Sequence, residues 1–454
     1  MPKKKTALTI EERLQQALVP AEEQPYEVPE NWVWVRLESV ASWGSGGTPS
    51  RKHEEYYNGD ILWIKTGELN NGWIYDTEEK ITDEGLKKSS AKLFPPYSVL
   101  IAMYGATIGK VAILGVPATT NQACACAVCN QSLLYMYLFY YCISQKNVFI
   151  EKGKGGAQPN ISQIILKQHP IPLPPLSEQQ RIVERIEELF TKLDEAKERL
   201  QEVADSFAVR KAAILHKAFT GELTKQWRCE NGVSDESWEE KTIGEICSSL
   251  KYGTSKKSSD DGEVVVLRMG NLQNGEIDWS NLAYTSDEED IKKYLLKSGD
   301  VLFNRTNSPE LVGKTSIYRG EMPAIYAGYL IKLDYEKNIV VGDYLNYYLN
   351  SSKAKEYYMQ VKTDGVSQSN INAKKIGEFE ISLPTITEQH EIVRLIDDLL
   401  ARERAAQQAT EQALASIDLM KKSILARAFR GELGTNKASE ASALELLKQV
   451  LAEN

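Results

Sequence analysis

A long segment of the chain occurs twice, and this repeat limits the folds available to it. Residues 158–223 align without a gap on residues 368–433, at an offset of 210 residues, and 22 of the 66 aligned positions are identical. The identities gather at the two ends, where PLPPLSEQQRIV faces SLPTITEQHEIV and AFTGEL faces AFRGEL. An internal repeat of this length predicts that one structural unit is built twice.

The middle of each copy keeps its apolar period although the identity is lost. Apolar residues alternate at steps of four and three, which is the a/d spacing of a coiled coil, and Val203 and Met420 continue this spacing. The second copy has two polar breaks, Glu403 and Thr410, which either fix register or are solvated positions at a frayed seam. The predicted seam consists of Ile182, Ile186, Leu189, Leu193, Leu200, Phe207, Ile392, Ile396, Leu399, Ile417 and Ile424.

The ends of both helices follow from residues that start or stop a helix. Pro175 cannot lie inside a helix, Ser177 and Thr387 are the predicted N-caps, and Gly221 and Gly431 suit the C-terminal ends. Each helix then has about 43 residues and is ~65 Å long. Neither can bury its apolar seam alone, so we expect the two helices to pack as a long antiparallel pair related by an approximate two-fold axis.

The segment before each helix predicts a strand-rich globule, because short β-branched and aromatic runs are broken by Gly, Asn and Pro. The two globules echo one another: WIKTGELNNGWI at residues 63–74 faces VLRMGNLQNGEI at residues 266–277. The predicted fold class is therefore mixed α/β. The predicted order is an arm (1–29), a globule (30–157), a helical region (158–223), a second globule (224–367), a second helical region (368–433) and a tail (434–454).

The arm and the tail each predict one short amphipathic helix. Thr9 and Glu12 fit a capping box before IEERLQQAL, and ASALELLKQVLAEN can form a helix near the C-terminus. The arm either contacts a partner subunit, completes the helix array, or is a disordered tail.

Composition restricts the class of protein. Hydrophobic residues make up 42% and charged residues 26%, and no apolar run approaches the ~18–20 residues of a membrane span. With no export signal and six cysteines in a large chain, we expect reduced thiols and a cytoplasmic protein. The formal net charge of −9 disfavours DNA binding unless positive charge is concentrated locally or supplied by a partner.

Several stretches resemble catalytic or metal-binding motifs without meeting their requirements. FPPY at residues 94–97 lacks the Asp or Asn with which an adenine methyltransferase box holds its base, and SPELVGKT at residues 308–315 departs from a phosphate loop at its first residue. Cys124 and Cys126 alternate as small buried strand residues, and no second ligand pair completes a zinc site. We therefore expect no catalytic residue and no metal site in this chain.

The order globule–helix–globule–helix, together with GGTPSR at residues 46–51, PLPPLSEQQRIV and AFTGEL, resembles the specificity subunit of type I restriction-modification systems. The resemblance covers roughly residues 30–433. It implies that each globule recognises one half of a bipartite, asymmetric sequence in double-stranded DNA. It also implies that the helix pair sets the separation of the halves and docks two methyltransferase subunits, to which restriction subunits are added.

The same resemblance implies that S-adenosylmethionine, ATP and Mg²⁺ bind to partner subunits and that this chain needs no cofactor. DNA half-sites one helical turn apart lie ~34 Å from centre to centre, which is within the length of the predicted helices. The alternative is a non-enzymatic coiled-coil scaffold that joins two protein-binding modules. A self-contained methyltransferase would need the catalytic box and cofactor motif that this sequence lacks.

Candidate DNA contacts are loop donors: Arg and Lys for phosphates and guanine, Asn and Gln for adenine. Two pairs occupy matching positions in the globules, Lys65 with Arg268 and Lys110 with Lys314. The glycine before each lysine of the second pair fits a tight turn that presents it. The other candidates are Arg51, Lys52, Tyr104, Asn121 and Gln122 in the first globule, and Lys251, Lys256, Lys257, Asn304, Arg305 and Asn307 in the second.

Overall fold

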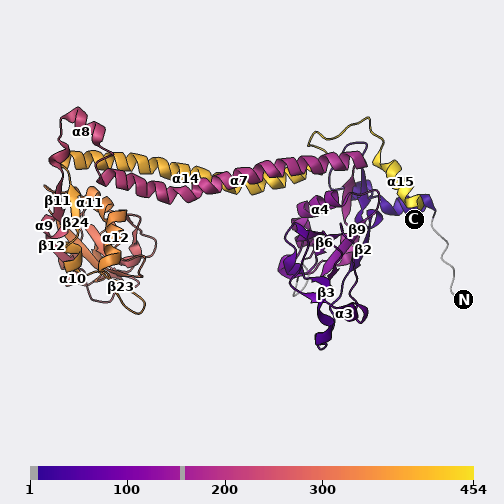
Figure 1. Ribbon diagram of the computed structural model, residues 1–454, viewed down its shortest axis with the longest axis horizontal. Coiled ribbons are helices and arrows are strands. Elements are labelled where there is room, and N and C mark those ends of the chain that lie inside the picture. The colour runs from indigo at the N-terminus through magenta and orange to yellow at the C-terminus, as the bar shows by residue number, and fades with distance from the viewer. Residues whose placement is uncertain (1–8, 154–158, 454) are drawn as a thin grey trace. The chain divides into compact units, whose positions relative to one another are not determined.

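The computed structural model describes residues 9–153 and 159–453, so the start of the arm and Gln158, where the first repeat copy begins, lie outside the described residues. The chain forms two compact units. The first comprises the chain up to Arg199 together with the chain from Ala413 onward, and the second comprises Leu200–Gln412. Each unit contains one globule and a part of each long helix (Figure 1).

The two predicted long helices are confirmed as α7 (Leu176–Phe219) and α14 (Ile386–Ala428). The predicted N-caps were wrong, because Ser177 and Thr387 lie in the first turns of these helices. The capping hydroxyl of α14 belongs instead to Thr385, which accepts from the backbone N–H of Glu388 at 3.3 Å. Gly221 and Gly431 each follow a helix end with φ of 76°, a conformation that favours glycine.

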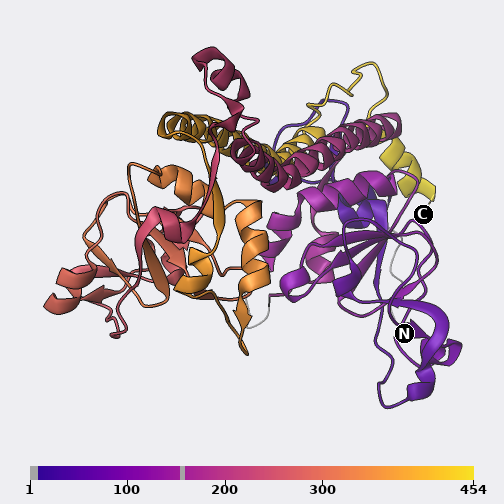
Figure 2. The same ribbon diagram turned by 60° about the vertical axis from the view of Figure 1, so that its left-hand side comes forward.

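Within each unit, α7 and α14 run antiparallel and side by side (Figures 1 and 2). In the first unit, Lys421 Nζ lies 2.6 Å from Asp194 Oδ1 across the two helices. In the second unit, Arg210 Nε lies 2.9 Å from Glu403 Oε2, so the Glu403 break has a partner on the facing helix. Thr410 satisfies its hydroxyl within its own helix, by donating to the Ala406 carbonyl at 2.8 Å.

The predicted seam is buried most completely where the helices also meet a globule. The predicted seam is not buried along its whole length. Val203 and Met420 keep the heptad spacing, but they are 40% and 48% exposed. The buried seam residues are Ile182, Ile186, Phe207, Ile392, Ile396 and Ile417. The partly buried ones are Leu189, Leu193, Leu200, Leu399 and Ile424.

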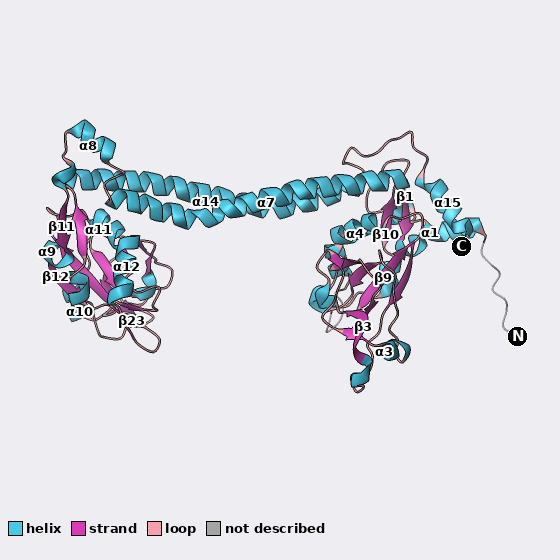
Figure 3. Cartoon of the chain, viewed as in Figure 1, coloured by secondary structure: helices cyan, strands magenta, loops and turns pink. Residues whose placement is uncertain are grey.

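The first globule is built on a five-stranded sheet and a three-stranded sheet (Figure 3). The five-stranded sheet has the order β2 (Ala41–Ser45), β9 (Cys124–Cys129), β6 (Val99–Ala102), β7 (Val111–Leu114) and β4 (Trp73–Ile74). The three-stranded sheet has the order β5 (Lys80–Ile81), β3 (Tyr57–Ile64) and β8 (Thr119–Thr120). β1 (Val33–Arg36) and β10 (Pro170–Leu173), from the two ends of the globule's sequence, pair antiparallel. The helices of this globule are α2 (Leu37–Val40), α3 (Asp83–Lys87), α4 (Tyr135–Ser144), α5 (Lys146–Lys152) and α6 (Gln163–Lys167).

The second globule repeats this strand order. Its larger sheet runs β12 (Cys247–Tyr252), β21 (Leu330–Tyr335), β17 (Val301–Asn304) and β19 (Thr315–Ile317), and a three-stranded sheet runs β16 (Tyr284–Thr285), β13 (Val264–Leu267) and β20 (Ala324–Tyr326). β11 (Glu239–Thr242) pairs with β24 (Glu380–Leu383) as β1 does with β10. The remaining strands are β14 (Leu272–Gln273), β15 (Glu276–Ile277), β18 (Thr306–Asn307), β22 (Thr363–Asp364) and β23 (Ser369–Asn370). The helices are α8 (Lys225–Asn231), α9 (Ile243–Ile246), α10 (Glu288–Tyr294), α11 (Gly342–Leu349), α12 (Ser352–Val361) and α13 (Ala373–Gly377).

The central strand of each larger sheet separates two apolar clusters. Val99 and Ile101 of β6 pack into the cluster that contains α4 and the long helices, whereas Leu100 and Ala102 pack into a second cluster on the opposite face. Successive side chains of a strand point to opposite faces, so four consecutive apolar residues fit a strand covered on both sides. The mixed α/β prediction and the duplication of the globule are both confirmed.

The described parts of the arm and the tail are folded against the first globule. α1 (Ile10–Ala17) has the predicted capping box, in which Thr9 Oγ1 accepts from the Glu12 N–H at 3.2 Å. Arg13 Nη1 of α1 donates to the carbonyl of Leu451 in α15 (Ala443–Glu453) at 3.1 Å. Residues of both helices join the core of the first unit, so the alternative of a disordered arm was wrong from Thr9 onward.

Candidate nucleic-acid interface

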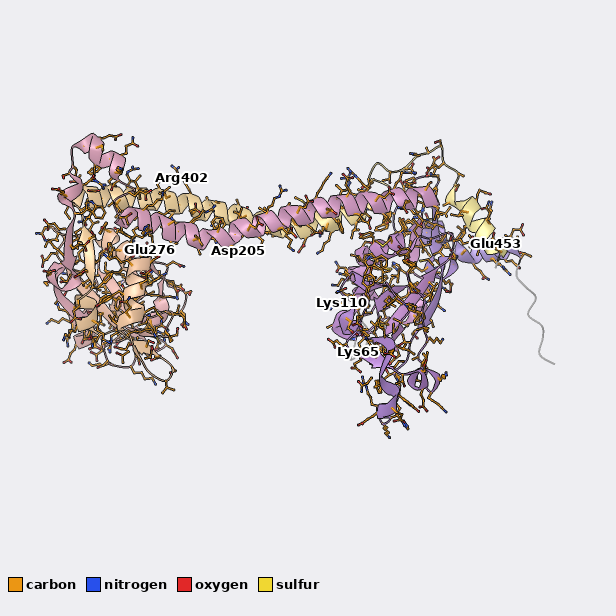
Figure 4. The ribbon with its side chains drawn as sticks, viewed as in Figure 1. Lys65, Lys110, Asp205, Glu276, Arg402 and Glu453 are labelled. Atoms are coloured by element: carbon orange, nitrogen blue, oxygen red, sulfur yellow. The ribbon has the colours of Figure 1, made fainter. Side chains whose placement is uncertain are left out.

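The two residue pairs that align in the sequence also match in local structure. Lys65 and Arg268 each precede a short 3₁₀ turn, and each backbone N–H donates to a side chain three residues later, at 2.7 and 2.9 Å. Lys110 and Lys314 each follow a glycine with positive φ, 75° at Gly109 and 91° at Gly313. The globules therefore present two cations each from equivalent positions, and Figure 4 shows Lys65 and Lys110 on the first globule.

In the first globule, Arg51 and Lys65 share one carboxylate. Glu79 lies 2.7 Å from the Arg51 guanidinium and 2.9 Å from Lys65 Nζ. These contacts raise the pKa of both cations and lower the pKa of Glu79. The Arg51 guanidinium also lies over the rings of Tyr57 and Trp63, at 4.4 and 5.2 Å from their centroids. The arrangement holds a half-exposed guanidinium in a fixed orientation, which suits bidentate recognition of guanine or phosphate.

The other candidates of the first globule differ in what their side chains already bind. Lys52 and Gln122 are exposed, and Gln122 Oε1 accepts from the Thr48 hydroxyl at 2.5 Å. Asn121 is partly buried and its side-chain oxygen accepts from the Ala123 N–H at 3.1 Å, which stabilises the local turn.

Tyr104 is 41% exposed. Lys110 is partly exposed and forms no ion pair with any residue that the structure describes.

Arg305 of the second globule is held by an aromatic ring and by backbone hydrogen bonds. Its guanidinium lies 4.8 Å from the ring centroid of Tyr252, and Nη1 donates to the Gly328 carbonyl at 3.2 Å. Its backbone bonds to Tyr329 on one side and Ile371 on the other. Nε is buried and has no hydrogen-bond partner among the described residues. Because Nε is enclosed, contact with an acceptor from outside the chain falls to the Nη groups of this guanidinium, which is stacked on an exposed aromatic ring.

Among the described residues, some candidate lysines of the second globule form ion pairs with carboxylates, and others do not. Lys251 Nζ lies 2.8 Å from Asp334, whose pKa is lowered to about 2: burial alone would raise it, but hydrogen bonds from Lys251, Lys332 and Ser249 outweigh burial. Lys256 is bound to Asp287 at 2.7 Å, and Lys314 donates to Gln273 at 2.9 Å. Lys257 is exposed and has no ion pair within the described part of the chain. The Arg268 guanidinium donates to Asn281 at 3.2 Å.

The asparagine prediction in β17 needs correction. Asn304 is fully buried, its side-chain oxygen accepts from the Thr306 N–H at 3.3 Å, and its side-chain nitrogen has no partner among the described residues. A side chain enclosed in this way does not reach DNA, so Asn304 is excluded from the interface. Asn307 is partly exposed and its oxygen accepts from the Ser308 N–H at 2.8 Å.

The stretches that resemble catalytic or metal motifs have ordinary structural places. Phe94 of FPPY is 7% exposed, and its backbone forms an isolated antiparallel β-bridge with Ala118. Cys124 and Cys126 are buried in β9, and burial raises the pKa of both thiols. Among the residues that the structure describes, no group of three or more His, Cys, Asp or Glu side chains is placed to hold a metal ion.

Sequence reasoning missed the residues that join each globule to its helix. Glu178 and Glu388, in the first turns of α7 and α14, are fully buried. Each accepts from the indole N–H of a tryptophan, Trp32 at 2.8 Å and Trp238 at 3.3 Å. The following glutamines, Gln179 and Gln389, bond to backbone groups of the globules. The identical Glu-Gln pairs and the matching ENW and ESW stretches were the available signal.

Comparison with known proteins identifies a repeated domain in the chain. The family model for the type I restriction modification DNA specificity domain matches twice, over residues 29–204 and 235–414. The EcoKI specificity subunit of Escherichia coli strain K12 is 27% identical over 450 residues, covering 94% of this chain and 96% of that protein. The StySPI specificity subunit of Salmonella potsdam is 26% identical over 449 residues, with the same shares covered.

Two solved structures share the fold. The HsdS subunit from Thermoanaerobacter tengcongensis has a TM-score of 0.64 at 21% identity, covering 90% of this chain and 100% of that one. A chain from a study of complex assembly and conformational transition in the type I R-M system has a TM-score of 0.67 at 21% identity, with the same coverage. In the described residues, no helix has the length and apolar character required to cross a membrane. The chain belongs to the type I restriction modification DNA specificity family and contains two such domains in tandem.

Proposed function

We propose that this chain is the DNA-recognition subunit of a type I restriction-modification complex, in which each globule recognises one half of a bipartite, asymmetric sequence. The observation that carries this proposal is the double match of the specificity-domain model, one match per globule. It is supported by the cations that the two globules present from equivalent positions, Lys65 with Arg268 and Lys110 with Lys314. Differences around these positions give each half its own base preference.

The long helices have two roles in this proposal. They set the separation of the two recognition domains, and they dock two adenine methyltransferase subunits, with restriction subunits added to the same complex. Catalysis then belongs to the partners, which bind S-adenosylmethionine, ATP and Mg²⁺, and the complex acts on DNA in the cytoplasm. In the described part of the chain, the candidate DNA contacts are loop cations and amides, which are suited to binding rather than to acid–base or nucleophilic catalysis.

The acidic balance of the chain fits this division of labour. With a formal net charge of −9, the chain needs basic surface from its partners to neutralise DNA phosphates. The local cations then supply orientation and base contacts, and the methyltransferases supply much of the backbone affinity.

The test is base-resolution mapping of methylated adenine in cells that express the chain with the modification subunit encoded beside it. We expect a methylated split, asymmetric motif that disappears when this chain is omitted. An assembled and catalytically active complex that leaves no such mark would contradict DNA recognition and favour a scaffold that joins two protein-binding modules.

A further inference from the structure

A cleft of about 840 Å³ opens in the second unit where the helix pair meets the globule. One wall comes from α7 and α14, and the other from the first turn of α12, the loop before β19 and the turn at Glu276, which Figure 4 shows beside the helices. This cleft contains neither the Arg305 site nor the Arg268 site described above. It does contain Lys314, which donates to Gln273 at 2.9 Å, so one candidate DNA contact lies at its wall and the others lie outside it.

Three cations from three different helices converge on this cleft. Lys211 comes from α7, Lys355 from α12 and Arg404 from α14, and none of them forms an ion pair with a described residue. Burial lowers the pKa of Lys211, and the charges of Lys355 and Arg404, which line the same cleft, lower it further. The N-terminal end of α12, capped by Ser351, adds the positive end of a helix dipole.

The carboxylates of the cleft do not balance these cations. Glu276 is bound to Arg319 at 2.9 Å, and Glu403 is bound to Arg210 at 2.9 Å. Glu310 is the lining carboxylate that has no ion pair in the described part of the chain. With Lys314 also at the wall, the cleft keeps a surplus of positive charge, which is complementary to an acidic ligand.

The inner surface of the cleft is apolar. Phe207, Leu215, Tyr358 and Leu400 line it and are nearly buried, with 9%, 4%, 2% and 6% of their surfaces exposed. A nucleic-acid backbone would use the cations of the cleft but would leave its apolar inner surface without a partner. A protein segment with apolar side chains on one face and carboxylates at its edge matches both features.

The corresponding place in the first repeat has different chemistry. At the 210-residue offset, Lys421 corresponds to Lys211 and Asp194 corresponds to Arg404. Lys421 Nζ lies 2.6 Å from Asp194 Oδ1 and 5.0 Å from the ring centroid of Phe190. The first repeat thus neutralises its lysine internally, whereas the second repeat carries three unpaired cations.

We propose that the cleft of the second repeat binds an acidic, amphipathic segment of the modification subunit, and that the first repeat offers no equivalent site. This inference rests on the proposed function, because it takes its occupant from the subunits that the helix pair docks. The cleft is continuous with that helix pair, and its charge is complementary to the segment. The two modification subunits are then bound unequally, with the tighter one at the second repeat.

Titration of the purified modification subunit into the full-length chain, followed by native mass spectrometry, tests this inference. We expect the wild-type chain to bind two modification subunits in two steps. In the K211E/K355E/R404E variant, the Kd of the tighter step should rise at least tenfold. The charges lie at exposed side-chain ends, and unchanged thermal unfolding shows that the variant folds. The matched control is the D194K/K421E exchange, which keeps the ion pair of the first repeat with its charges reversed. In this control, the Kd of each step should stay within about twofold of the wild-type value.

A photo-crosslinking residue at Ser352, in the first turn of α12, identifies the occupant. A crosslink to a segment of the modification subunit rich in Asp and Glu supports the inference. A crosslink to DNA, or equal binding steps in wild type and triple variant, overturns it while leaving the proposed function intact. If the modification subunit does not bind the wild-type chain at all, both the inference and the proposed function fail.

Discussion

The indole N–H of Trp32 donates a 2.8 Å hydrogen bond to the carboxylate of Glu178, and both side chains are buried. Trp32 precedes the first strand of its globule and Glu178 lies in the first turn of α7, so this bond fixes the helix to the globule. Trp238 and Glu388 repeat the arrangement at 3.3 Å in the second unit. The two carboxylates differ in a further hydrogen-bond donor. Asn436 donates to Glu178 at 2.9 Å, whereas Arg228 donates to Glu388 at 2.7 Å.

Replacement of Arg228 with Met is expected to destabilise the second unit by about 3–5 kcal/mol, because it leaves the buried Glu388 carboxylate without its cation. The Arg228 side chain is 8% exposed and that of Glu388 is 0% exposed, so water does not take over the role. Hydrogen exchange of peptides spanning β11 and the start of α14 measures the loss. R228M/E388Q should recover part of it, and the control Asn436→Ala, which removes a neutral donor, should cost about 1 kcal/mol. Equal losses in both single variants would refute the special role of the charge.

Acidification is expected to weaken the first unit through His169. Burial and then the nearby charge of Lys152 lower the pKa of His169 from 6.5 to about 3, so the folded state keeps the ring neutral. Because the unfolded chain binds a proton below pH 6.5, stability falls as the pH drops from 6.5 towards 3, and this group contributes no pH dependence above that range. Urea unfolding between pH 5.0 and 7.5 measures the slope. His169→Gln should reduce the dependence of the unfolding free energy on pH in this range. An unchanged slope in that variant would rule out this histidine as the cause.

Arg305 is expected to contact a base and Lys257 a phosphate. Arg305→Lys keeps the charge but loses the planar guanidinium stacked on Tyr252, so we expect about 1–3 kcal/mol weaker discrimination at one position of one half-site. Lys257→Ala should weaken binding to all sequences alike and lower the salt slope by about one. Competition binding of the assembled complex to single-base target variants separates the two outcomes. Identical base selectivity in Arg305→Lys and wild type would remove Arg305 from base recognition.

The isolated chain is expected to bind DNA weakly and with strong salt sensitivity, and the complex to bind tightly. The reason is the net charge of −9, against which the local cations supply only part of the phosphate contact. Fluorescence anisotropy with a target duplex at several salt concentrations measures both species. Tight, sequence-specific binding by the chain alone would contradict the assignment of backbone affinity to the partners.

The long helices could be predicted from the sequence because their signals are local. The heptad spacing, Pro175 and the glycines at 221 and 431 placed both helices correctly to within two residues. The N-cap of α14 was missed because Thr385, after a proline, is as good a cap as Thr387, and only the hydrogen bond to Glu388 decides between them. Val203 and Met420 keep the period yet are exposed, since the period does not show where the seam leaves its partner helix.

The candidate interface was predicted less completely. Alignment of the repeats paired Lys65 with Arg268 and Lys110 with Lys314, and their local geometry agrees. Asn304 was wrong because residue type alone does not show that both faces of its strand are covered. The sharing of Glu79 by two cations, the stacking on Tyr252 and the cleft at Lys211 depend on contacts between distant segments. No sequence window contains those contacts.

The measurement that tests the central claim most directly is methylated-adenine mapping with one variant in each globule. The wild-type complex defines the split motif, and Arg51→Ala and Arg305→Ala are then mapped under the same conditions. We predict that Arg51→Ala relaxes or abolishes recognition of one half only, and that Arg305→Ala does so for the other half only. Loss of selectivity at the same half in both variants, or an unchanged motif in both, would contradict the assignment of one half-site to each globule.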